Sequence, residues 1–490
     1  MPPRNLLLIA LSIVISLACY SVASKNRYAN LFAETLEVVE RQSLREIPRE
    51  DLFVSAMEGM LEDLDGHSMF ISKKMFTMFD EDMKQEFGGV GMYVESDPKT
   101  EQLVVLAPMP KTPAFEAGLK PGDQIVTIDG VATKGKSRAE AIELLRGRLG
   151  EAVELLIDRD GESLTKILKR AIIPVASVHG DYRNPDGTWN FTLRETPRIG
   201  YIRLIQFGEK SAEEIYDALM SIDGKVDGIV IDVRNNSGGL LDVAIEICDM
   251  FLPADLSIVS IRGRAKKLIS EYSSTSSQAV NANTPVAVLI NRRSASASEI
   301  LAGCLQDHGR AVLVGEQSWG KGTVQNVIPI QRGESALKLT TASYWRPSGV
   351  NIDRFDEEAK KTKIWGVQAS EGFAIDMTDE EFFENTRQRN LRDLQALVTP
   401  KEAEMITTLR EQAQAEAIAK AKEEAKKAGK ESELGIYAPD GPTPEGPAQN
   451  SDPNDPSYDP AKADAPYVDR PLRQALEYFR KILQERQVAA

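Results

Sequence analysis

Residues 171–353 alternate short apolar runs with amphipathic stretches, and this alternation restricts the possible folds more than any other feature of the chain. The runs "VDGIVIDVRNN" and "TPVAVLIN" have the composition of buried strands, whereas "GGLLDVAIEICDMFL" and "SEILAGCLQDHG" have the three- and four-residue spacing of helices. Strands that alternate with helices favour an α/β fold with a largely parallel sheet. We therefore expect one α/β core across these residues.

Two different segments precede this core. Apolar residues recur at three- and four-residue intervals over residues 25–85, which predicts an N-terminal helical region. Residues 86–170 contain several short strands, a helix expected over 137–147 and a strand expected over 152–158. This combination predicts a small α+β module inserted before the core.

The chain becomes polar after the core. Within residues 354–468, "EMITTLREQAQAEAIAKAKEEAKKAGKE" predicts a solvated helix, because it is rich in strong helix formers. The stretch "APDGPTPEGPAQNSDPNDPSYDP" that follows predicts a flexible linker. Residues 469–490 are amphipathic again and predict a helix that packs back on the core.

Residues 1–24 have the pattern of a targeting segment, and we do not expect them to be part of the fold. Arg4 precedes an apolar run over residues 6–23, and small residues lie at the end of that run. This pattern is typical of a signal peptide, and a membrane anchor formed by residues 6–23 is the alternative. Under both interpretations the body of the protein is exported, to the periplasm or another extracytoplasmic space.

Charge and cysteine content exclude several classes of protein. The 490 residues carry a formal net charge of −15 without a basic cluster among aromatic residues, which argues against a nucleic-acid partner. Cys19, Cys248 and Cys304 form no CxxC pair, so we expect free thiols rather than disulfides or a zinc site. The three histidines are scattered, and we expect no metal site.

The stretch "NRRSASASEIL" places Ser294, Ser296 and Ser298 at alternate positions where a strand ends and a helix begins. The N–H groups of a helix N-terminus can stabilise an anion, which suits a nucleophilic serine. Each of the three serines could equally be a helix cap. The spacing alone does not select one of them.

The stretch "GEQSWGKGTVQN" nearly spells a phosphate-binding loop, but Gly322 replaces the required Ser or Thr and a strand follows in place of a helix. Lys321 suits a different role. Burial disfavours the charged form of a lysine and lowers its pKa, so that it can accept a proton from serine. On a strand, Gln325 would share a face with Lys321 and could orient it.

The block "SASASEILAGCLQDHGRAVLVGEQSWGKGTVQ" resembles the signature of the carboxyl-terminal processing (tail-specific) peptidases, which are Ser/Lys serine proteases with an internal PDZ domain. The resemblance implies that Ser296 is the nucleophile, Lys321 the base and Gln325 its assistant, with Asp307 in support. "DVRNNSGGLL" is similar to a further element of that family. It implies an oxyanion hole formed by Ala297 with either Gly238 or Gly239.

The module at 86–170 resembles a PDZ domain in "PAFEAGLKPGD", and "GGVGM" is similar to the carboxylate-binding loop of that family. The glycines would leave backbone N–H groups available there to bind a terminal carboxylate, and the edge of the next strand would pair with the peptide. "LDGHSMF" and "DRPLRQALEYF" also resemble family motifs, whereas residues 354–468 depart from the family. The tail-binding residues implied by this resemblance are Gly89, Val90, Gly91 and Met92.

The resemblance implies a serine endopeptidase that cleaves exported proteins near their C-termini, without a cofactor. The alternative is a catalytically silent PDZ protein that acts as an adaptor. The presence of the nucleophile, the base and both glycines favours the enzyme. The expected partners are proteins or peptides with apolar C-terminal tails, an adaptor protein and a second copy of the chain, with membrane contact only through the N-terminal segment. The PDZ domain is expected to act as a lid, with hinges near Phe87-Gly88 and residues 172–174.

Overall fold

The computed structural model describes residue 5 and residues 11–16, 27–184, 186–275, 277–330, 332, 334–362, 364–394, 396–410, 412–413 and 467–489. The chain divides into two compact units. The first unit contains residues 1–77 and 325–340, and the second contains residues 78–324 and 341–490. Each unit is described by itself below.

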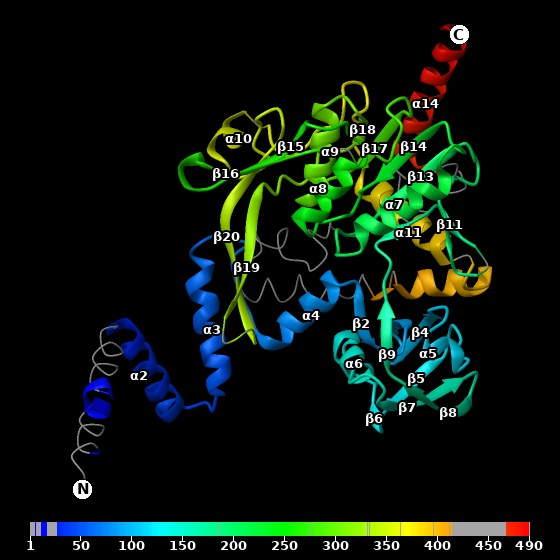
Figure 1. Cartoon of the computed structure of the whole chain (residues 1–490). Helices are drawn as coiled ribbons and strands as arrows, with labels where there is room; N and C mark the ends of the chain where they lie inside the picture. The colour runs from blue at the N-terminus through cyan, green and yellow to red at the C-terminus, as the bar shows by residue number, and fades with distance from the viewer. Residues whose placement is uncertain are drawn as a thin grey trace, which may run out of the picture. The chain divides into compact units, whose positions relative to one another are not determined.

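The first unit combines helices with one end of a long β-ribbon (Figure 1). Helices α2 (Arg27–Gln42) and α3 (Arg49–Glu62) confirm the helical pattern expected in this region. Strand β1 (Met69–Ile71) pairs antiparallel with β20 (Ser335–Trp345), which in turn pairs with β19 (Thr323–Ile330). The rings of Phe53 and Phe70 meet edge to face, with centroids 5.8 Å apart, and join α3 to β1. Helix α4 (Lys73–Met83) crosses into the second unit.

The core of the second unit is a five-stranded sheet in the order β10-β13-β14-β17-β18. The last four strands are parallel, while β10 joins the edge antiparallel to β13. Every residue of β13, β14 and β17 is buried, as expected for a sheet that is covered on both faces. The bounds are Val178–His179 for β10, Ile199–Leu204 for β13, Gly228–Asp232 for β14, Val286–Ile290 for β17 and Val312–Gly315 for β18.

Helices cover both faces of this sheet. Helices α7 (Ser211–Ile222), α8 (Leu241–Asp249) and α9 (Ala297–Asp307) share a buried cluster with alternate residues of the strands. The remaining strand residues face α14 (Arg470–Ala489), which buries Ala475 and Phe479 against them. The prediction that this last helix packs on the core is therefore confirmed.

Further strands flank the core. Strands β15 (Ser257–Arg262) and β16 (Leu268–Ser273) extend the sheet of β20, with the 3-10 turn η1 (Arg264–Lys266) between them. Strands β11 (Tyr182–Arg183) and β12 (Trp189–Asn190) form a small hairpin.

Residues 92–169 form a separate sheet in the order β3-β4-β5-β7-β8, with two helices. The chain enters and leaves this module through β2 (Glu86–Gly89) and β9 (Ala171–Pro174), which pair with each other. The helix and strand expected at 137–147 and 152–158 are confirmed by α6 and β7. The bounds are Met92–Ser96 (β3), Leu103–Pro108 (β4), Pro113–Glu116 (α5), Gln124–Ile128 (β5), Val131–Ala132 (β6), Arg138–Leu145 (α6), Ala152–Arg159 (β7) and Glu162–Lys169 (β8).

The segment after residue 353 contains α10 (Glu357–Thr362), α11 (Asp379–Leu394) and a helix over residues 400–410. The prediction of a solvated helix from residue 404 onward is wrong for its described part, because Ile406 is buried, as is Ala403 just before that stretch. Their cluster includes Leu106 and Ala107 of β4. The expected linker falls within residues 414–466, which lie outside the described residues.

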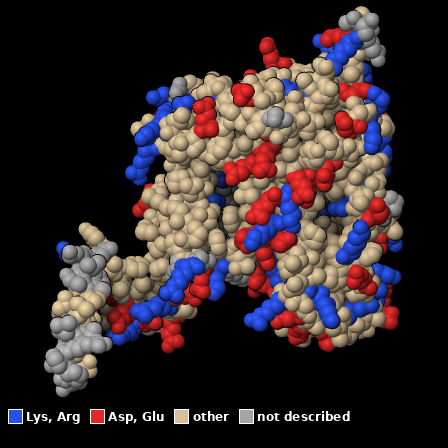
Figure 2. Space-filling model, viewed as in Figure 1, with Lys and Arg blue, Asp and Glu red and all other residues tan. Residues whose placement is uncertain are grey.

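Of residues 6–23, the structure describes 11–16, which are helical, and the rest of the predicted signal peptide or anchor lies outside the described residues. In the part of the chain that the structure describes, no helix is both long enough and apolar enough to cross a membrane. Cys248 and Cys304 are buried free thiols, as predicted, and Cys19 lies outside the described residues. On the face that Figure 2 shows, acidic and basic side chains are interspersed.

Candidate active site

Ser296 is the residue immediately before helix α9, and its backbone has an unusual conformation. Its φ is 55° and its ψ is −115°, a region that non-glycine residues rarely adopt. Such strain costs of the order of 1–3 kcal/mol and persists only where the surrounding structure imposes it. The side chain is partly exposed. A strained serine at a strand-to-helix turn is the arrangement that presents the nucleophile in α/β-hydrolases.

The two neighbouring serines are used by the core. Ser294 and Ser298 are fully buried. The Ser294 hydroxyl donates to the Val233 carbonyl at 2.8 Å, and the Ser298 hydroxyl donates to the Asn236 carbonyl at 2.9 Å. These bonds fasten the start of α9 to the loop after β14. They distinguish the three serines in a way that the spacing did not.

The loop that follows β14 contains Gly238 and Gly239 and lies against Ser296. We refer to it as the glycine loop. A Cβ built on Gly238 would come 2.8 Å from the Ser296 Cβ and 2.9 Å from the Ala297 nitrogen, so this position requires glycine. The Gly238 N–H already donates to Asn236 Oδ1 at 2.8 Å. Within the described residues, the N–H groups of Gly239 and Ala297 donate to no protein acceptor. Of the two glycines that the sequence left open, Gly239 therefore has the available donor.

Glu299 is a functional candidate that the sequence analysis missed. Its buried carboxylate accepts from the backbone nitrogens of Ser296 (2.7 Å) and Lys321 (2.8 Å). It also accepts from Ser318 Oγ at 2.5 Å and from the Gly320 nitrogen at 2.6 Å. Burial raises the pKa of Glu299 to about 7, although all four donors act to lower it. One carboxylate thus holds the backbones of the predicted nucleophile and the predicted base.

Lys321 lies two residues before β19 and is partly buried. The strand that follows it agrees with the rejection of a phosphate-binding loop, which requires a helix there. Gln325 belongs to the first unit, where its Nε2 donates to Thr340 Oγ1 at 3.3 Å. The Thr340 hydroxyl in turn donates to Asp65 Oδ1 at 3.1 Å. Asp65 belongs to the "LDGHSMF" motif, and Thr340 belongs to β20. The motif therefore holds in place the strand that contacts Gln325.

Asp307 lies at the far end of α9 from Ser296, which is about 16 Å along a helix of this length. Its carboxylate pairs with Arg346, with Oδ1 2.5 Å from the guanidinium, and also accepts from the Ser348 nitrogen at 3.0 Å. These contacts make Asp307 an anchor for the "YWRPSG" stretch. The structure does not bring it together with the three serines.

The residue range 198–356 matches Peptidase family S41, and the range 104–159 matches the PDZ domain family. The carboxy-terminal-processing protease of Bartonella bacilliformis is 38% identical over 338 residues, which cover 67% of this chain and 74% of that protein. The chain belongs to peptidase family S41.

A second relative of this S41 peptidase is the carboxy-terminal processing protease CtpB of Bacillus subtilis. It is 32% identical over 373 residues, covering 73% of the chain and 74% of CtpB. The solved structure of the photosystem II D1 C-terminal processing protease is 28% identical, with a TM-score of 0.39, and covers 71% of the S41 peptidase and 92% of that chain. The S41 peptidase is thus a serine-type carboxy-terminal processing protease, with an α/β core and a PDZ domain.

The PDZ domain of the S41 peptidase carries the predicted tail-binding loop between β2 and β3. The Val90 carbonyl accepts from Ala114 N at 2.8 Å, and the Gly91 carbonyl accepts from Met109 N at 3.0 Å. Among the described residues, the N–H groups of Val90 and Gly91 have no protein acceptor. Gly91 has a φ of 76°, and a Cβ there would come 2.4 Å from Thr112. Gly89 lies in β2 and Met92 in β3, on either side of this loop.

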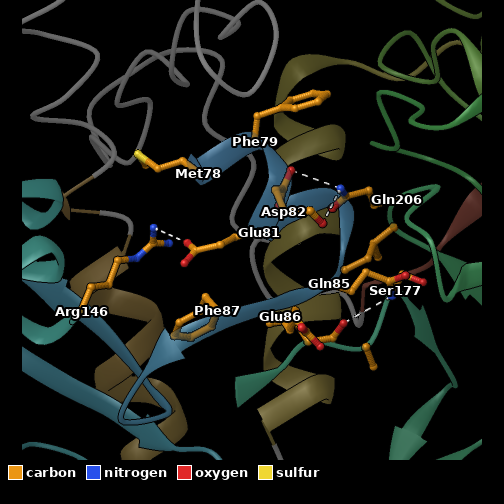
Figure 3. A pocket seen from close by; sticks show the side chains of 13 residues that line it. Met78, Phe79, Glu81, Asp82, Gln85, Glu86, Phe87, Arg146, Ser177 and Gln206 are labelled. Carbon is orange, nitrogen blue, oxygen red and sulfur yellow. Dashed lines mark hydrogen bonds and ion pairs between the residues drawn. The ribbon is translucent and has the colours of Figure 1, made fainter. Parts of the chain in front are cut away.

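A pocket of about 380 Å³ lies beside the two strands through which the chain enters and leaves the PDZ domain (Figure 3). Arg146, at the end of α6, pairs with Glu81 of α4 at 2.9 Å across it. Asp82 accepts from the Gln206 amide at 3.1 Å. The predicted hinge residues lie in this ribbon, where Phe87 pairs with Ile173.

A second group of charges that the sequence analysis did not single out lies at the end of β14. Arg234 is buried between Asp232 and Asp469, with nitrogen–oxygen distances of 2.7 and 2.9 Å. Burial opposes ionisation of both carboxyl groups, but Arg234 outweighs it and holds their pKa values below the ordinary range. The glycine loop of the S41 peptidase therefore begins at a point that is tied to the start of α14.

Proposed function

We propose that this protein is a serine endopeptidase that cleaves exported proteins near their C-termini, with Ser296 as nucleophile and Lys321 as general base. The observation that carries the assignment of Ser296 is the contrast among the three serines. Ser294 and Ser298 are buried and donate to core carbonyls, whereas Ser296 is partly exposed at a strained turn.

The reaction would follow the course of other serine peptidases with a lysine in place of histidine. The Ser296 oxygen attacks the scissile carbonyl carbon while its proton passes to the Lys321 amine. Collapse of the tetrahedral intermediate breaks the C–N bond, and the protonated Lys321 returns the proton to the leaving amine. Water then attacks the acyl-enzyme by the same route. Lys321 lies outside β19, so the shared strand face expected from the sequence does not support a role for Gln325, and the family resemblance alone assigns Gln325 to orient the amine.

Negative charge on the carbonyl oxygen requires preorganised donors. The N–H groups of Gly239 and Ala297 have no other acceptor among the described residues. Ala297 follows Ser296 in the chain, and Gly239 follows Gly238, where a Cβ would come 2.8 Å from the Ser296 Cβ. Each such donor is worth about 3 kcal/mol of transition-state stabilisation. Gly238 would contribute by its small size, because its own N–H is bonded to Asn236.

The PDZ domain would capture the apolar C-terminal tail. The N–H groups of Val90 and Gly91 suit a terminal carboxylate. Strand β3 lies at the end of its sheet, so its outer edge can pair with an extended peptide. The apolar run at residues 6–23 supports export of the protein.

The test is cleavage of an unstructured peptide with an apolar C-terminus, compared with the same peptide carrying a C-terminal amide. We expect Ser296→Ala and Lys321→Ala to abolish cleavage and Ser294→Ala with Ser298→Ala to reduce it. The amide should raise KM and leave kcat unchanged. Full activity of Ser296→Ala would refute the nucleophile. Binding of the tail without any cleavage would favour the adaptor function instead.

A further inference from the structure

The segment that departs from the family forms an interface of its own. Helix α11 and the helix over residues 400–410, gold to orange in Figure 1, both belong to the second unit. One side of this segment contacts the peptidase core, and the other contacts the PDZ domain. We refer to residues 379–410 as the strap.

The core side of the strap is held by buried ion pairs. Asp181 has no exposed side-chain surface and pairs with Arg392 at 2.5 Å and with Arg389 at 3.2 Å. Asp393 of the strap pairs with Arg203 of β13 at 2.5 Å. An unpaired charge is energetically costly to bury, so these ion pairs hold the strap and the peptidase core in one relative arrangement.

The PDZ side of the strap is apolar. Leu394, Val398, Ala403 and Ile406 form one buried cluster with Leu106 and Ala107 of β4. Because side chains alternate along a strand, Tyr93 of β3 faces this cluster while its neighbour Val94 faces the core of the PDZ domain. Burial accordingly raises the pKa of the Tyr93 hydroxyl. The strap therefore covers the back of the strand whose edge would bind the tail.

The strap restricts the rotation that the two-stranded ribbon of β2 and β9 would otherwise allow. Strands β2 and β9 alone would let the PDZ domain rotate about the ribbon axis. The strap adds an attachment at β4, and the pair between Arg146 and Glu81 adds another at the end of α6. Attachments away from the ribbon oppose such rotation.

We propose that the strap fixes the PDZ domain on the peptidase core, so that this domain captures substrate tails without swinging. The lid motion expected from the resemblance is thereby replaced by a fixed docking surface. The tail-capture part of this inference rests on the proposed function, whereas the fixed position of the domain does not.

The test measures the distribution of distances between two spin labels, one on an exposed position of the PDZ domain and one on an exposed position of the peptidase core. In a full-length chain with Cys19→Ser, cysteines replace Ile167 on β8 and Tyr216 on α7, which are 70% and 46% exposed. We expect one narrow distance that an apolar tail peptide leaves unchanged. A shift of that distance on addition of the peptide would overturn the proposal, and this comparison requires no strap variant.

A matched pair of variants tests the strap directly. Ile406→Asp places a charge in the buried cluster, whereas Thr408→Asp places the same charge on the exposed side of the same helix. We expect Ile406→Asp to broaden the distance distribution and raise KM for a tailed peptide about tenfold, with cleavage of the amidated peptide unchanged. Thr408→Asp should behave as the parent. A distance distribution in Ile406→Asp that is as narrow as in the parent would overturn the proposal. The absence of peptidase activity in the parent protein would instead count against the proposed function.

Discussion

Substitution of Glu299 by glutamine removes a charge from the centre of the candidate site with little change in shape. Glu299 accepts four hydrogen bonds, two on each oxygen. An amide keeps only one oxygen, so its NH₂ must face two donors. The least costly orientation directs the NH₂ toward Ser318, whose hydroxyl can reverse and accept, and leaves the Gly320 N–H without a partner. One buried donor without a partner costs about 1–3 kcal/mol.

The loss should appear in catalysis as well as in stability. Glu299 joins the backbones of Ser296 and Lys321, so a displaced carboxyl group displaces both. A misplacement of about 1 Å at a reacting group can cost about 100-fold in rate. We therefore expect Glu299→Gln to lower kcat by about that factor and to leave KM almost unchanged, as measured by peptide cleavage at saturating substrate.

The pH dependence provides an independent readout. Burial raises the folded-state pKa of Glu299 to about 7, against 4.5 for the ordinary side chain. The folded chain therefore binds more protons than the unfolded chain between these values, and stability falls as the pH rises through that window. A pKa difference of this size corresponds to about 3 kcal/mol. The free energy of unfolding of the parent should thus fall relative to Glu299→Gln by about this amount from pH 4.5 to above pH 7. Parallel stability curves, or a variant with full kcat, would refute the reasoning.

Three further substitutions test other parts of the site. A Cβ on Gly239 would lie 2.2 Å from the Phe207 carbonyl oxygen, so Gly239→Ala should shift the glycine loop and lower kcat at least 10-fold in the peptide assay, with KM as the control. Asp469→Ala leaves Arg234 buried with half of its ion pairs and should lower the free energy of unfolding by about 3 kcal/mol in urea titrations. Ser294→Ala removes a buried hydroxyl and should cost about 1–3 kcal/mol while cleavage continues, and its inactivity in a folded state would contradict the role given to this serine.

Periodicity was sufficient to predict the core. The strands at 228–232 and 286–290 are apolar runs because both of their faces are buried, and helix α8 between them keeps one apolar stripe. The same reasoning predicted α6 and β7. Such patterns are local, so they remain visible without knowledge of what packs against them.

The strap and Glu299 could not be predicted in the same way, because their partners are distant in the sequence. Ala403 and Ile406 look like ordinary members of a charged helix until Leu106, about three hundred residues earlier, is placed against them. Glu299 follows Ser296 by three residues, a spacing that predicts only a helix cap. Its contacts with Ser318, Gly320 and Lys321 depend on how a loop folds over the helix start.

Helix α14 has a consequence for the order in which the enzyme matures during synthesis. Phe479 covers Gly228 of the central strand β14, and Asp469 neutralises Arg234 beside the glycine loop. Both partners are synthesised more than two hundred residues after the strand they complete. A nascent chain that already contains Ser296 and Lys321 therefore still has an open sheet face and an incompletely paired arginine. We expect proteolytic competence to arise only after α14 has docked on the sheet, so that a chain whose last residues have not yet folded remains inactive.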